Sequence, residues 1–121
     1  MAESNRGNRF VPKLARNMAY KIAFTETGRK TYDECIEYIL FELGHPQAAR
    51  KLLEDIDMVL ESLQMAAASF ALCDDEDLRS HGLRKVHLRR HSYKIFYRVD
   101  GDNVYIEYVL HDKRDYKNII R

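Results

Sequence analysis

The stretch LRKVHLRRHSYKIFYRVDGDNVYIEYVLH, residues 83–111, decides the fold, because apolar and polar residues alternate along most of it. A period of two residues is typical of β-strands that bury one face. The pair Asp100-Gly101 interrupts the alternation and favours the tight turn of a hairpin. The stretch therefore predicts a three-stranded antiparallel meander.

The same alternation predicts which side chains share a face of the meander. The expected apolar face carries Val86 and Leu88 in the first strand, Ile95, Tyr97 and Val99 in the second, and Val104, Ile106, Tyr108 and Leu110 in the third. The opposite face would carry Lys85, His87 and Arg89, then Lys94, Phe96 and Arg98, then Tyr105, Glu107, Val109 and His111. We expect this second face to be polar and basic.

The chain before the meander predicts one strand and two helices. Residues 20–24 alternate like a short strand, whereas residues 28–43 and 46–63 place apolar residues at three- and four-residue spacings. Gly44 and Pro46 favour the end of one helix and the start of the next. We interpret the fold class as α+β, with an antiparallel helical hairpin covering the apolar face of the sheet. The acidic run 74–77 is interpreted as a solvated loop.

Charge is unevenly distributed along the 121 residues. Residues 79–121 hold eleven Lys and Arg against five Asp and Glu, whereas residues 20–78 hold five against thirteen. Such asymmetry points to a nucleic acid or an acidic protein as partner, although a solvated basic face without a ligand remains an alternative. Residues 1–17 are interpreted as a basic extension, with a single domain over residues 18–121.

Several classes of protein do not fit this composition. No apolar run approaches the roughly 20 residues of a membrane span, and no signal peptide is apparent. Cys35 and Cys73 lack the spacing of a disulfide framework or a zinc site, and consecutive carboxylates do not converge on a metal. We therefore expect a cytoplasmic protein without a cofactor or metal.

Several segments of the chain resemble the RelE/ParE superfamily of toxins from type II toxin–antitoxin systems. The matching segments are Tyr-Lys-Ile-Ala-Phe at 20–24, Pro-Gln-Ala-Ala at 46–49, Gly-Leu-Arg-Lys-Val at 82–86, Tyr-Lys-Ile-Phe-Tyr-Arg-Val at 93–99 and Val-Leu-His-Asp-Lys-Arg-Asp at 109–115. The resemblance implies a growth-arresting toxin that is neutralised by a cognate antitoxin protein.

The superfamily implies two mechanisms on one fold. RelE-like members cut messenger RNA on the ribosome, whereas ParE-like members are not nucleases and inhibit DNA gyrase. The basic strands favour RNA cleavage slightly, while the long helical hairpin and the Val-Leu-His ending resemble ParE-like members. A non-toxic adaptor that uses the same basic sheet is a third reading.

If the chain is a metal-independent ribonuclease, the resemblance and the shared face suggest roles for seven residues. His87 or Lys85 would be the general base, and His111 or Tyr116 the acid. Arg89, Lys94 and Arg114 would hold the phosphate, although RelE-like nucleases usually carry arginine where Lys94 stands. Arg84, Arg98 and Phe96 are further candidates for binding RNA or a partner. Phe96 could stack on a base, but ordinary packing between strands is the favoured alternative for it. A local structural hydrogen bond is an equal alternative for His111.

Overall fold

The computed structural model describes residues 19–120. In chain order its elements are β1 (Lys21–Phe24), α1 (Glu26–Glu37), a π-helical turn (Tyr38–Glu42), α2 (Pro46–Ala66), a 3₁₀ turn (Ala67–Ser69), α3 (Glu76–Ser80), β2 (Leu83–His87), β3 (Tyr93–Asp100), β4 (Asn103–His111) and α4 (Tyr116–Ile119). This order confirms the predicted strand, helical hairpin and meander. Residues 1–17 lie outside the described residues, and the domain boundary at residue 18 stays a prediction.

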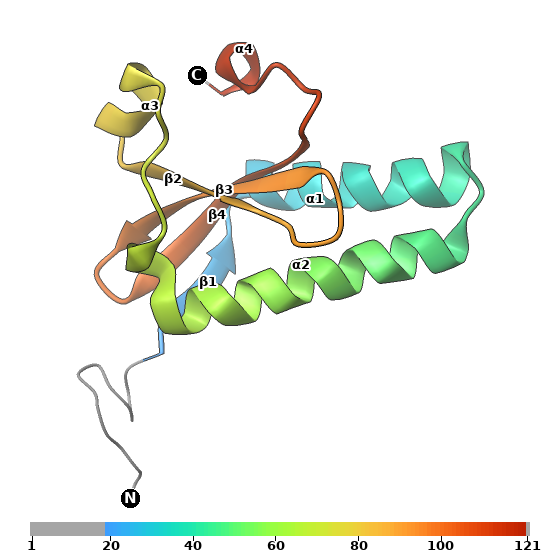
Figure 1. Cartoon of the computed structure of the whole chain (residues 1–121), viewed down its shortest axis with the longest axis horizontal. Coiled ribbons are helices and arrows are strands. Elements are labelled where there is room, and N and C mark those ends of the chain that lie inside the picture. Colours follow the sequence, from blue (N-terminus) through green and yellow to red (C-terminus); the bar gives the residue numbers. More distant parts are fainter. Residues whose placement is uncertain (1–18, 121) are drawn as a thin grey trace, which may run out of the picture.

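The four strands form one sheet in the order β1-β4-β3-β2. The meander strands pair antiparallel, and Gly101 takes φ 61° in the turn between β3 and β4, as the Asp-Gly pair predicted. β1 pairs parallel with β4, so the first strand closes the sheet beside the last one. Figure 1 shows α1 and α2 on one side of this sheet and α3 and α4 on the other.

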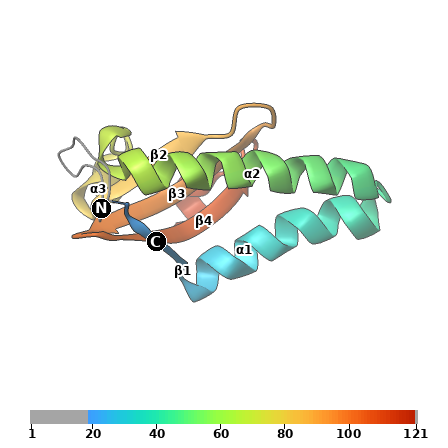
Figure 2. The same ribbon diagram turned by 90° about the horizontal axis from the view of Figure 1, so that it is seen from below.

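The helical hairpin packs its apolar stripe on the sheet. Leu52, Ile56 and Leu63 of α2 are fully buried against strand residues such as Ile95 and Ile106. The two helices diverge from their connection, and the connected end projects beyond the sheet (Figure 2). The last turn of the first helix is π-helical, and in this projecting end Tyr38, Phe41 and Leu43 remain exposed.

The second face of the sheet is not uniformly polar, which corrects the prediction. A second apolar cluster lies there and consists of Cys73, Leu78, Leu83, Phe96, Leu110 and Ile120. The acidic run 74–77 is also not only a loop, because Asp75 caps the short helix α3 by accepting a hydrogen bond from Leu78 N. α3 and the C-terminal segment thereby cover part of this face.

An irregularity in β4 explains why the predicted alternation fails after Ile106. Tyr97 is paired with Ile106, whereas Phe96 is paired with Tyr108, so Glu107 is an extra residue in its strand. Such a bulge shifts every later side chain to the other face. Val109 therefore joins the main core under the helices, while Tyr108 and Leu110 belong to the second cluster.

Candidate functional site

Four of the predicted site residues come together on the second face of the sheet: Lys85, His87, Lys94 and Tyr116. His87 of β2 is the register partner of Lys94 in β3, and Lys85 lies two residues before His87 on the same face. Strand alternation alone placed these three side chains correctly. With Asp112 and Tyr116, which follow β4, they form what we call the basic cluster.

Asp112 and Tyr116 both contact the cationic side chains of the basic cluster. The Asp112 Oδ1 atom lies 3.5 Å from Lys94 Nζ and 3.9 Å from His87 Nδ1. The Tyr116 ring lies beneath both ammonium groups, with its centroid 5.1 Å from Lys94 Nζ and 5.7 Å from Lys85 Nζ. Only 11% of the Lys94 side chain is exposed, against 59% for His87. An incoming phosphate would have to displace Asp112 to reach Lys94.

Phe96 is not available to stack on a base, and the structure shows the packing role that was the favoured alternative. Its side chain is completely buried in the second apolar cluster, where its ring centroid lies 5.2 Å from that of Tyr116. The C-terminal segment that carries Tyr116 closes over a position that alternation had assigned to an open face.

Arg84 and Arg98 both have partners within the fold. The Arg84 guanidinium donates a 2.5 Å hydrogen bond to the Phe70 carbonyl, on the helix side of the sheet. Arg98 Nε lies 2.9 Å from a Glu107 carboxylate oxygen and its guanidinium lies over the Tyr105 ring. Neither arginine lies beside the basic cluster as a free phosphate ligand.

Arg89 does not share the face of Lys85 and His87, because β2 ends at His87. Its backbone N–H donates to a carboxylate oxygen of Asp55 at 3.3 Å, and its side chain lines a shallow hollow on α2 with Met58 and Met65. The turn after β2 is therefore drawn toward the helices, and Arg89 goes with it.

Asp55 is the structural residue that sequence reasoning missed. Its buried carboxylate also accepts 2.8 Å hydrogen bonds from Arg90 N and His91 Nδ1. Burial raises the pKa of Asp55, but the hydrogen bonds from His91, Arg90 and Arg89 outweigh burial and hold that pKa below its ordinary value. The signal in the sequence was a carboxylate immediately before Ile56, inside the apolar stripe of α2.

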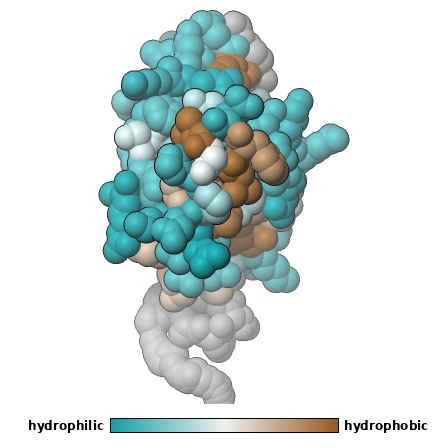
Figure 3. Space-filling model, turned by 90° about the vertical axis from the view of Figure 1, so that its right-hand side faces the viewer, coloured by the Kyte–Doolittle hydropathy of each residue, from teal (hydrophilic) through white to brown (hydrophobic). Residues whose placement is uncertain are grey.

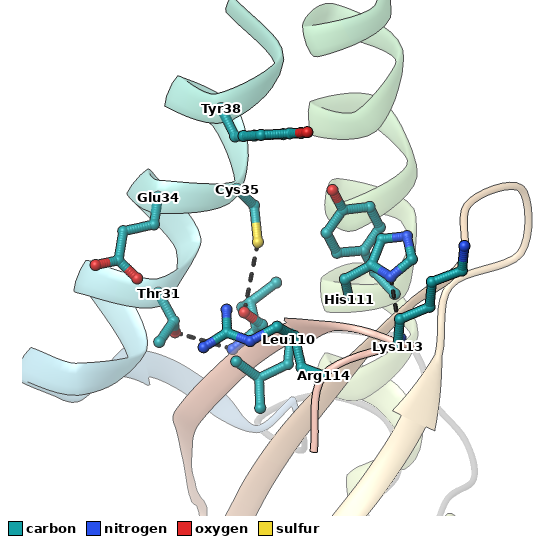
Figure 4. A pocket seen from close by; sticks show the side chains of 10 residues that line it. Thr31, Glu34, Cys35, Tyr38, Leu110, His111, Lys113 and Arg114 are labelled. Atoms are coloured by element: carbon teal, nitrogen blue, oxygen red, sulfur yellow. Dashed lines mark hydrogen bonds between the residues drawn. The ribbon is translucent and has the colours of Figure 1, made fainter. Parts of the chain in front are cut away.

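His111 and Arg114 lie on the opposite side of the sheet from the basic cluster. They line a cavity of about 750 Å³ between α1 and the end of β4, together with Cys35, Tyr38 and Tyr93 (Figure 4). The β4 bulge puts His111 there, where its ring meets that of Tyr93 edge to face at 4.9 Å. Its Nδ1 atom accepts a hydrogen bond from Lys113 N, which favours the local structural role over acid catalysis.

The cavity holds groups that stay protonated near neutral pH. Burial and the neighbouring Glu34 raise the pKa of the Cys35 thiol to about 11, although Arg114 acts to lower it. The thiol donates a hydrogen bond to the Val109 carbonyl. Burial also raises the pKa of Tyr93. Neither the Cys35 thiol nor the Tyr93 hydroxyl is therefore ionised as a nucleophile at neutral pH.

The projecting end of the hairpin is an apolar part of the surface of the described chain. Phe41 is 77% exposed, and Tyr38 and Leu43 are about half exposed. Figure 3 shows the apolar surface gathered at this end of the molecule, surrounded by hydrophilic residues. Because Tyr38 also lines the cavity, this apolar end and the cavity form one continuous surface.

Two further properties concern metals and membranes. Within residues 19–120, no group of three His, Cys, Asp or Glu side chains is placed to hold a metal ion. None of the helices in this described part has the length and apolarity that crossing a bilayer requires.

The sequence matches the model of one protein family. Residues 22–116 match the family model described as "ParE toxin of type II toxin-antitoxin system, parDE". No curated protein matches.

Two solved structures share the fold. One is titled "Chromosomal ParDE TA system from P. aeruginosa", with 20% identity, a TM-score of 0.62, and coverage of 77% of this chain and 96% of that chain. The other is the toxin–antitoxin complex RelBE2 from Mycobacterium tuberculosis, with 20% identity, a TM-score of 0.52, and coverage of 77% and 98%. Both confirm the predicted α+β fold.

Proposed function

Because this chain belongs to the ParE toxin family of type II toxin–antitoxin systems, we propose that it arrests growth by binding and inhibiting DNA gyrase. In this proposal the chain is not an enzyme, and it acts in the cytoplasm, where gyrase and its DNA are found. The alternative is the ribosome-dependent cleavage of messenger RNA that the basic strands had favoured.

The proposal rests on the burial of Lys94 and on its contacts with Asp112 and Tyr116. Metal-free RNA cleavage needs a base, an acid and a cation that meets the growing charge on the phosphate. Lys94 is the predicted cation, but it is largely buried, faces Asp112 at 3.5 Å and lies over the Tyr116 ring. The other predicted phosphate ligands, Arg89 and Arg114, lie elsewhere on the molecule. This arrangement suits a binding protein better than a nuclease.

One observation favours the second candidate, RNA cleavage. Lys85, His87 and Lys94 share a face, and His87 is exposed enough to meet a ligand. If Asp112 moved away, His87 or Lys85 would be the base, Lys94 the phosphate ligand and Tyr116 the acid. Nuclease activity would then require a rearrangement of the segment after β4.

A cognate antitoxin fits the family, and we propose that it covers the apolar end of the hairpin and the adjoining cavity. The exposed Phe41 and half-exposed Tyr38 and Leu43 are the kind of side chains that a partner buries. An apolar or helical antitoxin segment could insert a side chain into the cavity beside Cys35.

The two mechanisms are separated by measuring RNA and gyrase on the same variants. We expect the purified chain to inhibit supercoiling by DNA gyrase, and primer extension after its induction to show intact transcripts. The double variant Lys85→Gln/His87→Gln should arrest growth to the same extent as a matched control. That control, Lys30→Gln/His45→Gln, carries the same two kinds of substitution on the helical hairpin. New transcript ends that disappear only in the Lys85/His87 variant would replace the gyrase proposal by RNA cleavage.

A further inference from the structure

The outward face of α2 has an apolar hollow that the proposed function does not use. Met58, Ser62 and Met65 lie on one side of the helix and, with Glu61, Ala66 and Arg89, line a shallow depression of about 550 Å³. Met65 is 74% exposed, although a methionine is flexible and well suited to pack against another apolar group. The described residues leave this hollow open to solvent and so accessible to a ligand.

An acidic stripe runs beside this hollow. Glu54, Asp57 and Glu61 are spaced by three and four residues, which places them on one side of α2, and all three are exposed. The salt bridges formed among residues 19–120 do not include any of these three carboxylates. The outward face of α2 therefore offers negative charge next to exposed methionine.

The chain enters the described fold beside this face. Tyr20 N donates a 2.8 Å hydrogen bond to the carbonyl of Gln64, the residue before Met65. The described part of the chain therefore begins beside the C-terminal end of α2 (Figure 1). Eighteen residues can span up to about 60 Å, whereas a helix of 21 residues is about 32 Å long, so the segment can reach all of the stripe.

The sequence of the attached segment complements the face in charge and in apolarity. It contains Arg6, Arg9, Lys13 and Arg16 against a single acid, Glu3. It also contains three apolar residues close together: Phe10, Val11 and Leu14. An aromatic ring packs favourably against methionine sulfur, and basic side chains are attracted to the three exposed carboxylates of the stripe.

We propose that residues 1–18 dock across the outward face of α2, with Phe10 in the hollow between Met58 and Met65. The basic side chains of the segment then lie beside Glu54, Asp57 and Glu61. This surface is on the outward side of the helical hairpin, away from the basic cluster. The docked segment would cover the exposed Met65 and keep this face of α2 from other partners.

The test uses the full chain with the photo-crosslinking residue benzoylphenylalanine in place of Phe10. We expect a crosslink within one chain to the peptide that contains Met58 or Met65, identified by mass spectrometry. The variant Glu54→Lys/Asp57→Lys/Glu61→Lys should lower the yield at least five-fold. Adding Arg9→Glu/Lys13→Glu/Arg16→Glu to that variant should restore the yield, which a merely misfolded helix would not allow.

A matched control places the same charge change on the other helix of the hairpin. The variant Asp33→Lys/Glu37→Lys/Glu42→Lys alters three exposed acids of α1 and its π-helical turn and should leave the crosslink unchanged. The proposal is overturned if the Phe10 probe forms no adduct, or if its adducts map outside α2. Adducts only between chains, as for a second copy, or equal yields in both triple variants, would overturn it too.

Discussion

The Asp55 carboxylate sets the conformation of the turn between β2 and β3. It is buried, yet it accepts three hydrogen bonds from consecutive residues of that turn, Arg89, Arg90 and His91. Hydrogen bonds to a charged group are stronger than neutral ones, and an unsatisfied buried group costs the full desolvation penalty. One side chain of α2 thus determines where two neighbouring arginines emerge.

Replacing Asp55 tests this role. Asp55→Ala leaves two backbone N–H groups and an imidazole without their acceptor, so we expect the free energy of unfolding to fall by about 3 kcal/mol. Urea denaturation followed by circular dichroism measures the change. Asp57→Ala, on the exposed side of the same helix, should change the stability by less than about 0.5 kcal/mol. Equal effects of the two substitutions would contradict the assigned role.

The contribution of Asp55 should also depend on pH in a defined direction. Its pKa in the folded state lies below the ordinary value of 3.8, so its ionised form stabilises the fold. The contribution is fully present above about pH 4 and is lost as the pH falls through the folded pKa. Urea midpoints between pH 7 and pH 3 should therefore differ between the natural chain and Asp55→Asn by an amount that shrinks on acidification. A difference that grows toward pH 3 would refute the assignment.

At single positions, the sequence predicted exposure well only where strands are regular. Alternation was enough to bring Lys85, His87 and Lys94 to one face, because no bulge lies between them. It could not predict which residue covers Phe96, since Tyr116 comes from a segment twenty residues later. Nor could it predict Asp55, because a carboxylate on a helix is usually exposed.

The first helix is held against the sheet through a close contact of backbone with backbone. Thr25 caps α1 by accepting from Gly28 N, and it also donates to the Ile106 carbonyl in β4. A Cβ at Gly28 would collide with that same carbonyl. Glycine at position 28 therefore permits the approach between α1 and β4 on which the cavity wall depends.

Adding a single methyl group at this contact should be costly. We expect Gly28→Ala to lower the free energy of unfolding by about 3 kcal/mol, because α1 must move away from β4. Gly44→Ala is the control: Gly44 has φ +65° and no neighbour near its missing Cβ, so it should cost only about 1 kcal/mol. Thermal denaturation of both variants gives the comparison, and a Gly28 variant as stable as the Gly44 variant would disprove the close contact.

The elements themselves were predictable because each has a clear period, whereas the bulge was not. Glu107 sits in a run that reads as regular alternation, so the sequence assigned Val109 and Leu110 to the wrong faces. The irregularity separated His111 from the basic strands and so divided the candidate site. One inserted residue in β4 thus moved His111 away from the basic cluster.

For the whole molecule, the projecting hairpin end should govern recognition of the antitoxin. Aromatic side chains that become buried in an interface commonly contribute about 2 kcal/mol each, which corresponds to roughly a thirty-fold change in affinity. Phe41→Ser should therefore weaken binding of the cognate antitoxin by at least ten-fold, measured by calorimetry. Lys30→Ser, on the exposed side of α1, is the control and should bind normally. Unchanged affinity of the Phe41 variant would place the antitoxin elsewhere.

The parallel pairing of β1 with β4 affects how the chain can be made. Lys21 is the partner of Asn103, so the strand synthesised first has to wait for the one synthesised last. Contacts between residues so distant in sequence slow folding, since a long loop must close before they form. On the ribosome, the helical hairpin can assemble early, but β1 stays without its partner until β4 has been translated. A toxin built this way cannot complete its sheet before β4 has been made, which leaves time for an antitoxin to be waiting.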